Sequence, residues 1–339
     1  MKCAVIGASG YTGGELLRLI SRHDQFEASE IVAHTNAGEL IGDIHPGLTD
    51  YGAQRFKKLD IHSIRECEIV FMALPHGQSS QIVSQLPEKQ MIIDLGADFR
   101  LESSYSWEKY YGGDHPGTWV YGLPELPGQR AKVASSLRVA NPGCYATAIE
   151  LSLAPLLKVI ESEDIVVVAA SGTSGAGRSA KHSLSASTVM NSLTSYKFGG
   201  IHQHTPEIEE SLTRIGSKPV KVSFTPILAP MPRGILSTIT ARLSSEISEI
   251  SIRELFEEAY SHEQFIHLLP IGQMPQSASV NGSNNVQIQV GVDSHTNRVI
   301  VSTVIDNLGK GAAGQAIQNA NIMNKLPEAM GLLSQGLGV

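Results

Sequence analysis

The sequence predicts an α/β protein built from two domains. Its 339 residues are more than one typical hydrophobic core holds. The first 140 residues alternate strand-like and helical segments, which is typical of a parallel sheet with helices on both faces. Beyond residue 144, several strand-like segments alternate polar and apolar residues, as strands with one wet face do. We therefore expect a first domain over 1–143 and a second over 144–310, with the helix of 311–339 returning to the first.

The elements follow in order from local patterns. In the first domain the expected strands are 2–6, 29–34, 68–74, 91–95 and 137–140, with helical segments at 15–23 and 77–86. In the second domain a helix over 145–160 leads to five strand-like runs at 164–171, 220–228, 234–243, 285–293 and 298–306. A last helix is expected over 311–325. The second domain is thus predicted as an α+β domain with a mixed or antiparallel sheet.

Composition excludes several classes of protein. The net charge of −7 would repel nucleic acid and anionic membranes, so neither is expected as a partner. We see no secretory signal and no apolar run of membrane-spanning length. The three cysteines are widely spaced and odd in number, without the spacing of a metal site or disulfide framework. These features predict a reduced, cytoplasmic protein without a metal.

A glycine loop joins the first predicted strand to the first predicted helix. Glycines in this context let the backbone approach a pyrophosphate, and the helix N-terminus adds oriented N–H donors. We therefore predict a Rossmann-like dinucleotide-binding domain, the alternative being a tight turn that binds nothing. The cofactor-binding residues expected here are Gly7, Ser9, Gly10, Tyr11, Thr12 and Gly13.

The second predicted strand ends in HTNAGE, and residues 33–38 include no acid to hold a ribose hydroxyl. Thr35 and Asn36 can hydrogen-bond a 2′-phosphate, which favours NADP (NADPH) over NAD, although both residues also suit a plain turn. Two further segments are expected near the cofactor. They are MALPHG, with Leu74, Pro75 and His76, and SGTSGAGRSAK at 171–181, with Ser174 and Gly175. The second segment also carries Arg178 and Lys181, charges that suit a pocket for phosphate or carboxylate.

Cys144 lies on the corner NPGC at the start of a predicted helix. A thiolate at a helix N-terminus is stabilised by unpaired N–H groups and the helix dipole, and the same groups can stabilise an oxyanion. These features favour a nucleophile over a small buried residue. Cys3 and Cys67 lie in or beside core strands and are expected to be buried without a chemical role.

Histidines and arginines supply the remaining candidates. His202 and His204 precede Thr205, a good N-cap, so we expect an extended lead-in that turns both rings to one side. The helix start would keep an imidazole neutral, as a general base requires. Arg233, just before a strand, and Arg100, just after one, suggest pockets for phosphate and carboxylate, although each alone is commonly a surface charge.

Together these features suggest phosphorylating acyl reduction. A thiolate would attack an acyl phosphate, phosphate would leave, and the resulting thioester would be reduced to an aldehyde.

Several segments make the sequence similar to the N-acetyl-γ-glutamyl-phosphate reductases of arginine biosynthesis. They are GASGYTGGELLRL, MALPHG, DLGADFRL, YGLPEL, NPGCYATA, SGTSGAGR, HQHTPEI and PMPRG. The resemblance implies Cys144 as nucleophile, His202 as acid/base, His204 and Tyr196 at the substrate, NADPH as cofactor and a homo-oligomer, dimer or tetramer, joined by the second domain. Ala146 replaces the family's usual proline, and the arginine often found near the second strand end is missing.

Three alternatives share parts of this pattern. An aspartyl-phosphate or aminoadipyl-phosphate reductase would use the same chemistry, and one methylene of substrate length discriminates by only about 1–3 kcal/mol. A non-catalytic NADP-sensing regulator would retain the glycine loop alone.

Overall fold

The structure of the chain is a computed structural model that describes residues 1–178, 182–216 and 218–338. It divides into two compact units. Unit 1 comprises 1–124, 128–142 and 312–332, and unit 2 comprises the described residues of 125–127, 143–311 and 333–339. Residues 125–127 and the C-terminal residues 333–338 thus belong to unit 2. Among the described residues no helix combines the length and apolarity needed to cross a membrane.

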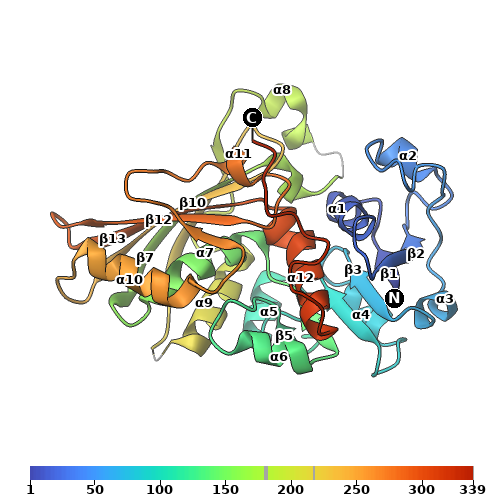
Figure 1. Ribbon diagram of the computed structural model, residues 1–339, viewed down its shortest axis with the longest axis horizontal. Helices are drawn as coiled ribbons and strands as arrows, with labels where there is room; N and C mark the ends of the chain where they lie inside the picture. Colours follow the sequence, from blue (N-terminus) through green and yellow to red (C-terminus); the bar gives the residue numbers. More distant parts are fainter. Residues whose placement is uncertain (179–181, 217, 339) are drawn as a thin grey trace. The chain divides into compact units, whose positions relative to one another are not determined.

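Unit 1 is built on a six-stranded sheet in the order β2-β1-β3-β4-β6-β5, and every strand pair in it is parallel (Figure 1). The strands are β1 (Lys2–Ile6), β2 (Glu27–Val32), β3 (Ile69–Met72), β4 (Met91–Asp94), β5 (Val120–Tyr121) and β6 (Arg138–Ala140). Apolar clusters cover both faces, with Leu16 and Phe71 on one side and Val70 and Ile92 on the other. This is the doubly covered parallel sheet that the continuous apolar runs predict.

The helices of unit 1 are α1 (Tyr11–Ile20), α2 (Ile41–Ile44), α3 (Ile61–Arg65), α4 (Ser79–Val83), α5 (Ser104–Tyr110), α6 (Gln129–Ser135) and α12 (Gly314–Met323). The helix expected over 77–86 is shorter in the structure, and α2, α3, α5 and α6 were not expected. All four are at most seven residues long, too short for a helical period to be distinct in the sequence. The expected C-terminal helix is α12, and a π-helical turn, Gly309–Ala313, precedes it.

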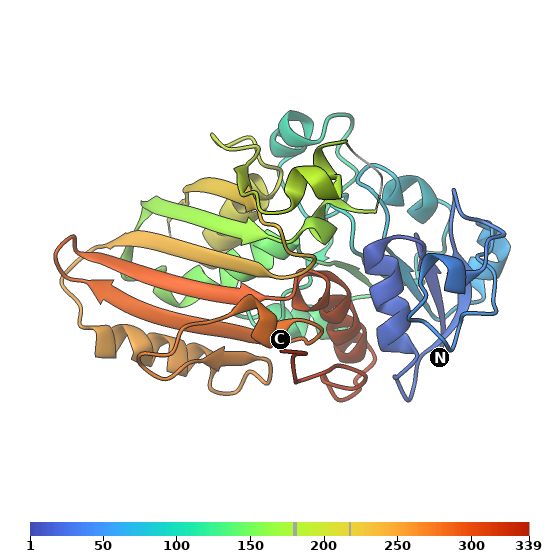
Figure 2. The ribbon, with the colours of Figure 1, turned by 90° about the horizontal axis from the view of Figure 1, so that it is seen from above.

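Unit 2 carries a seven-stranded mixed sheet in the order β11-β12-β13-β10-β7-β9-β8 (Figure 2). Its strands are β7 (Ile160–Ser171), β8 (Thr194–Ser195), β9 (Val222–Leu228), β10 (Ile235–Leu243), β11 (Ile266–Leu268), β12 (Val286–Asp293) and β13 (Arg298–Ile305). The pairs β7–β9 and β11–β12 are parallel and the other pairs antiparallel. The predicted mixed α+β sheet is therefore confirmed.

Three helices, α7 (Cys144–Leu153), α9 (His204–Ile215) and α10 (Glu249–Tyr260), pack on one face of this sheet, as Figure 1 shows. Two short helices, α8 (Ala186–Val189) and α11 (Ser277–Val280), lie in its connections. The helix expected over 145–160 was predicted too long. It ends at Leu153 because Pro155 cannot continue the α-helical hydrogen bonds, and a 3₁₀ turn (Ala154–Leu156) leads into β7.

Candidate active site

The glycine loop of unit 1 forms a closely packed cradle. Gly7 has φ +86°, and a Cβ built on it would lie 2.2 Å from the Ala73 carbonyl oxygen. A Cβ on Gly13 would lie 2.4 Å from the Gly7 oxygen. Only glycine fits at these two points. Helix α1 begins at Tyr11, and no described side chain caps its N-terminus, so this end suits an anionic group. The loop thus fits the pyrophosphate of a dinucleotide.

All the predicted cofactor residues of unit 1 lie at the carboxyl ends of neighbouring strands. Ser9 and Gly10 follow β1, and Tyr11 and Thr12 form the first turn of α1. Thr35 and Asn36 follow β2. The third group, Leu74, Pro75 and His76, follows β3. Because β1 lies between β2 and β3, the strand order reverses here, which is where open α/β sheets bind their ligands.

Two charged side chains, Arg55 and Glu39, lie at the turn after β2, and neither was among the predicted cofactor residues. The Arg55 guanidinium donates to the Gly38 carbonyl at 2.7 Å, and the Asn36 amide donates to the Glu39 carboxylate at 3.2 Å. Arg55 reaches this turn because a β-bridge joins Leu40 to Arg55. A cation thus lies beside the segment that reads the ribose in this fold class.

Two acidic side chains organise the loops after β3 and β4. Asp98 accepts hydrogen bonds from the backbone N–H groups of Gly77 and Ser80, at 2.6 and 3.0 Å, and so fixes the turn that carries His76. Asp94 is fully buried and accepts from Ser79 Oγ at 2.7 Å. Burial, followed by the charge of Asp98, raises the pKa of Asp94 to about 6.

Arg100, predicted at the substrate, has a buried side chain that donates to the backbone carbonyls of Leu95 and Asn141, both at 2.8 Å. The guanidinium therefore spans the ends of β4 and β6 and orders the backbone that enters the NPGC corner.

Cys144 is the first residue of α7, and its helix N-cap is Gly143. Gly143 donates its N–H to Glu207 Oε1 at 2.7 Å, and its carbonyl accepts from the Thr147 N–H at 2.8 Å. On the other side a Cβ built on Gly311 would lie 2.8 Å from Cys144 Cβ, so only a glycine leaves room for the nucleophile there. Cys144 is partly exposed, whereas Cys3 and Cys67 are buried as expected.

The two histidines are brought together, but by a different backbone from the one expected. Helix α9 begins at His204 and its N-cap is Gln203, in a helical conformation, so Thr205 is not the cap and the lead-in is not extended. The turn 201–203 places the ring centroids 4.9 Å apart. The error arose because Thr205 and Pro206 are equally compatible with positions inside the first helical turn.

His202 is buried, and its Nδ1 accepts a hydrogen bond from the His204 backbone N–H at 3.1 Å. In the neutral ring the proton therefore lies on Nε2. Burial is the main cause that lowers the pKa of His202 to about 2, followed by the neighbouring His204 and Lys197. His202 is thus a neutral N–H donor across the physiological range.

Two tyrosines border the histidines. Tyr196 donates its hydroxyl to the Tyr145 hydroxyl at 3.1 Å. Burial raises the pKa of Tyr196 to about 12 and raises that of Tyr145 further, so both are protonated at neutral pH. The Tyr145 ring meets the rings of His202 and His204 edge to face. This aromatic packing fixes the orientation of both imidazoles.

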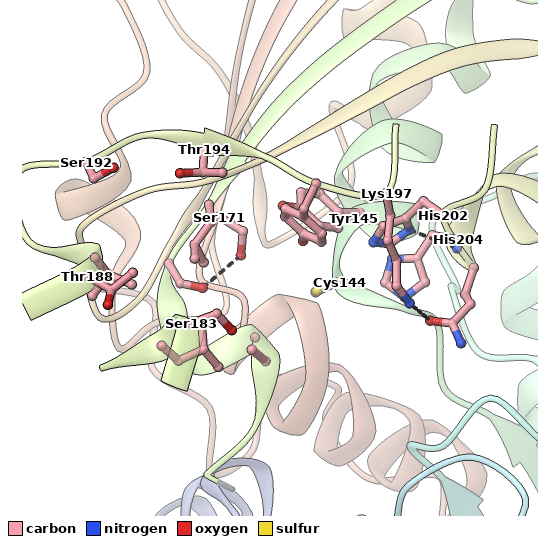
Figure 3. Close-up of a pocket in the computed structure, with 18 residues that line it drawn as sticks. Cys144, Tyr145, Ser171, Ser183, Thr188, Ser192, Thr194, Lys197, His202 and His204 are labelled. Atoms are coloured by element: carbon pink, nitrogen blue, oxygen red, sulfur yellow. Dashed lines mark hydrogen bonds between the residues drawn. The ribbon is translucent and has the colours of Figure 1, made fainter. Parts of the chain in front are cut away.

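These residues line one cavity of about 530 Å³ within unit 2 (Figure 3). Cys144 lies between the aromatic group and a wall of hydroxyl-bearing residues that includes Ser171, Ser183 and Thr188. Gly175 also lines the cavity. Among the described lining residues Lys197 is a cation, and none of them is a carboxylate. An anionic small molecule therefore suits the cavity.

Other predicted residues lie close by in unit 2. Arg233 is bound to the buried Asp306 through two contacts, Nε–Oδ1 at 3.1 Å and Nη2–Oδ2 at 2.7 Å, and it is not a lining residue. The Ser174 hydroxyl accepts from Asn307 Nδ2 at 2.9 Å. Arg178 is exposed, and Lys181 lies outside the described residues.

Glu207 is the functional candidate that the sequence analysis did not single out. It is buried in the first turn of α9, and through Gly143 it joins the helix that carries His204 to the helix that carries Cys144. The signal was present in HQHTPEI, but the sequence alone does not show which backbone amide a helix-start carboxylate accepts from.

Two protein-family models match the chain in succession. The NAD-binding domain of semialdehyde dehydrogenases matches residues 2–134, and the dimerisation domain of semialdehyde dehydrogenases matches residues 144–307. An N-acetyl-gamma-glutamyl-phosphate reductase from Acidothermus cellulolyticus is 54% identical over 338 residues, 99% of this chain and 98% of the relative. The chain belongs to the N-acetyl-gamma-glutamyl-phosphate reductase family. A reductase of the same name from Streptomyces avermitilis is 48% identical over 99% of both chains.

Solved structures agree on the fold at low sequence identity. Aspartate semialdehyde dehydrogenase II from Vibrio cholerae, complexed with ASA, has a TM-score of 0.72 at 17% identity, covering 96% of this chain and 98% of that one. Aspartate semialdehyde dehydrogenase with NADP from Candida albicans has the same TM-score and identity, covering 95% and 98%. The predicted fold class, a Rossmann-like domain with a second domain of mixed sheet, is therefore confirmed.

Proposed function

We propose that the chain reduces N-acetyl-γ-glutamyl phosphate to N-acetylglutamate semialdehyde and phosphate in arginine biosynthesis, with NADPH as reductant and a thioester on Cys144 as intermediate. The observation that carries this proposal is the cavity in which Cys144, at the start of α7, lies with the buried neutral His202 and without a described carboxylate. The family membership gives the substrate.

In the first step the Cys144 thiolate attacks the acyl carbon. A C–S bond forms, the carbonyl becomes an oxyanion, and its collapse breaks the C–O bond to phosphate, which leaves with the electron pair. The N-terminus of α7 stabilises negative charge at both the sulfur and the oxyanion. Lys197 adds a positive charge to the lining that an acyl phosphate meets.

In the second step the thioester is reduced, and the bound nicotinamide supplies the hydride equivalent. The tetrahedral oxyanion then collapses to the aldehyde and the C–S bond breaks, which restores the Cys144 thiolate. Before this collapse, His202 stabilises the oxyanion with a hydrogen bond from its Nε2–H and keeps the proton. This is the role its tautomer supports, because a base at Nε2 would need the proton on Nδ1, where the His204 N–H is bound.

NADPH is the proposed cofactor, held at its pyrophosphate by the loop 7–13. Thr35 and Asn36, with Arg55 beside them, are the proposed contacts of the 2′-phosphate. The Glu39 carboxylate, in contrast, favours NAD, because an acid here accepts from a ribose hydroxyl and repels a 2′-phosphate. The preference between NADP and NAD is therefore set by the balance of Arg55 against Glu39. We propose Ser174 and Gly175 as further cofactor contacts, and His204, Tyr196 and Arg233 as substrate contacts, Arg233 acting once Asp306 has oriented it.

We further propose a homo-oligomer that works in the cytoplasm, where its three free thiols stay reduced. The face of the unit 2 sheet opposite α7 and α9 exposes apolar side chains on neighbouring strands, namely Val166, Val168, Leu236 and Ile300. Such a face suits a partner sheet of the same chain in a dimer or tetramer. The matched dimerisation domain covers these strands.

The test of the function is a substrate panel run in reverse, with NADP and phosphate. N-acetylglutamate semialdehyde should be oxidised far faster than aspartate semialdehyde or the one-carbon-longer aminoadipate semialdehyde. Comparable turnover of two of them would contradict the substrate assignment. Turnover of none, with NADPH bound, would favour a non-catalytic sensor.

A further inference from the structure

The segment between β2 and β3 supplies a buried histidine, His45, that neither the sequence analysis nor the proposed mechanism uses. His45 follows α2 and is 8% exposed. Its ring packs edge-on against Phe56, with centroids 6.2 Å apart. A buried polar ring of this kind is expected to have a hydrogen-bond partner.

The Nε2–H of His45 donates to the backbone carbonyl of Ala8 at 2.9 Å. Ala8 is the second residue of the glycine loop and is itself fully buried. Its N–H donates to the Val32 carbonyl at 2.9 Å. Both backbone polar groups of Ala8 are therefore held from within unit 1.

This anchoring orients the next amide of the loop. The Ala8 carbonyl and the Ser9 N–H belong to one planar trans peptide, in which they point in opposite directions. Because the carbonyl points at His45, the Ser9 N–H points away from it. Ser9 precedes the open N-terminus of α1, where an anion would bind.

A second, independent observation ties His45 to this helix. Gly14 is the fourth residue of α1. A Cβ built on it would lie 2.4 Å from Cε1 and 2.6 Å from Nδ1 of the His45 ring. Alanine is ordinarily the better residue inside a helix. Any side chain at position 14 would therefore displace the ring of His45.

We propose that His45 is a positioning residue for the dinucleotide, which holds the glycine loop from behind and sets cofactor affinity without touching the cofactor. The segment that carries it is itself firmly held. The Gly38 N–H donates to the Phe56 carbonyl at 2.8 Å, and the Ile41 N–H donates to the Gln54 carbonyl at 2.9 Å. The inference rests on the proposed binding of NADPH to this loop.

The direct test measures the Kd for NADPH in the full chain. His45→Asn removes the bond because its amide is too short to reach Ala8, whereas His45→Gln places an amide N–H near the position of Nε2. We expect His45→Asn to raise Kd about ten-fold, as the loss of one well-placed hydrogen bond does, and His45→Gln to restore most of it. The kcat at saturating NADPH should change little in either.

His23 provides the matched control. It is equally buried in unit 1, and its Nε2 is bonded to Asn321 Oδ1 at 2.9 Å, away from the glycine loop. His23→Gln should lower Tm without changing the Kd for NADPH. If His45→Asn and His45→Gln both bind NADPH as the unmodified protein does, the inference is wrong. If the unmodified protein itself binds no NADPH, the proposed function fails instead.

Gly14 gives a second test that survives poor folding of one variant. Gly14→Ala should lower Tm and raise Kd in the unmodified protein, because the methyl group displaces the ring. In a His45→Ala background the same substitution should raise Tm, because the ring is absent and alanine favours the helix. An equal effect of Gly14→Ala in both backgrounds would overturn the inference.

Discussion

Cys144 owes its proposed role as nucleophile to its position at the start of α7. Cys144→Ala should abolish turnover and leave the Kd for NADPH unchanged, because the glycine loop belongs to unit 1 and Cys144 to unit 2. Cys67→Ala is the control, since Cys67 is buried beside β3 and should leave kcat unchanged. Residual activity above a few per cent in the Cys144 variant would remove the nucleophile assignment.

His202 should give a pH profile without an acid limb. Its pKa is lowered to about 2, so the ring is neutral at every higher pH, and kcat/KM reports the free enzyme. We expect no loss of kcat/KM attributable to this ring between pH 8 and about pH 4. His202→Asn should lower kcat by about 10²–10⁴-fold, whereas His204→Asn should mainly raise KM. The reverse pattern would exchange the two roles.

The grouping of candidate residues could be predicted where chemistry and local context coincide. Cys144, with Pro142 and Gly143 before it, lines one cavity with His202 and His204, although their helix begins at His204 rather than after Thr205. Arg55 could not be predicted, because it reaches the turn after β2 through a bridge formed only in the fold. The contacts of Arg100 could not be predicted, because sequence does not show which backbone carbonyls accept from its guanidinium.

At the scale of elements, α7 and α9 are joined by one buried hydrogen bond between Gly143 and Glu207. Glu207→Leu should lower kcat by at least about ten-fold, since it leaves the Gly143 N–H without its acceptor and frees the corner that orients Cys144. Glu207→Gln retains an acceptor oxygen and should recover most of the rate. Glu209→Leu is the control on the same helix, because Glu209 accepts instead from the Val222 N–H in β9.

The buried carboxyl group of Asp94, at the end of β4, makes the free energy of unfolding depend on pH. Because its pKa is raised to about 6, the folded state binds more protons than the unfolded state between about pH 4 and 6, and the free energy of unfolding falls as pH rises through that window. The loss is about 3 kcal/mol. Asp94→Asn should therefore stabilise the protein more at pH 8 than at pH 4, as denaturant melts would show. An equal effect at both pH values would contradict the raised pKa.

Helices and strands could be predicted wherever the element was long enough for its hydrophobic periodicity to show in the sequence. The longer strands of both sheets were recognised from apolar runs and alternation, whereas the two- and three-residue strands β5, β8 and β11 were missed. The helices α2, α3, α5 and α6 are too short to show a helical period, and Pro155 ended α7 earlier than expected. The π-helical turn at Gly309–Ala313 has no sequence pattern that would distinguish it from an ordinary helix start.

At the scale of the whole molecule, the open face of the unit 2 sheet should decide the assembly. Val168→Glu places a charge on a face that is expected to pack against a partner copy, so it should shift the protein to monomer in light scattering after size exclusion. Ile250→Glu, on an even more exposed apolar residue of α10, should leave the assembly intact. The same oligomer in both variants would exclude this face as the interface.

The account as a whole depends on a covalent acyl-enzyme. Intact-protein mass spectrometry after mixing with N-acetyl-γ-glutamyl phosphate, without NADPH, measures it directly. The account predicts that the unmodified protein gains the mass of one N-acetylglutamyl group, that peptide mapping assigns the adduct to Cys144, that added NADPH removes it, and that Cys144→Ala shows none. An adduct of the same yield in Cys144→Ala, or catalytic turnover without any adduct on Cys144, would contradict it.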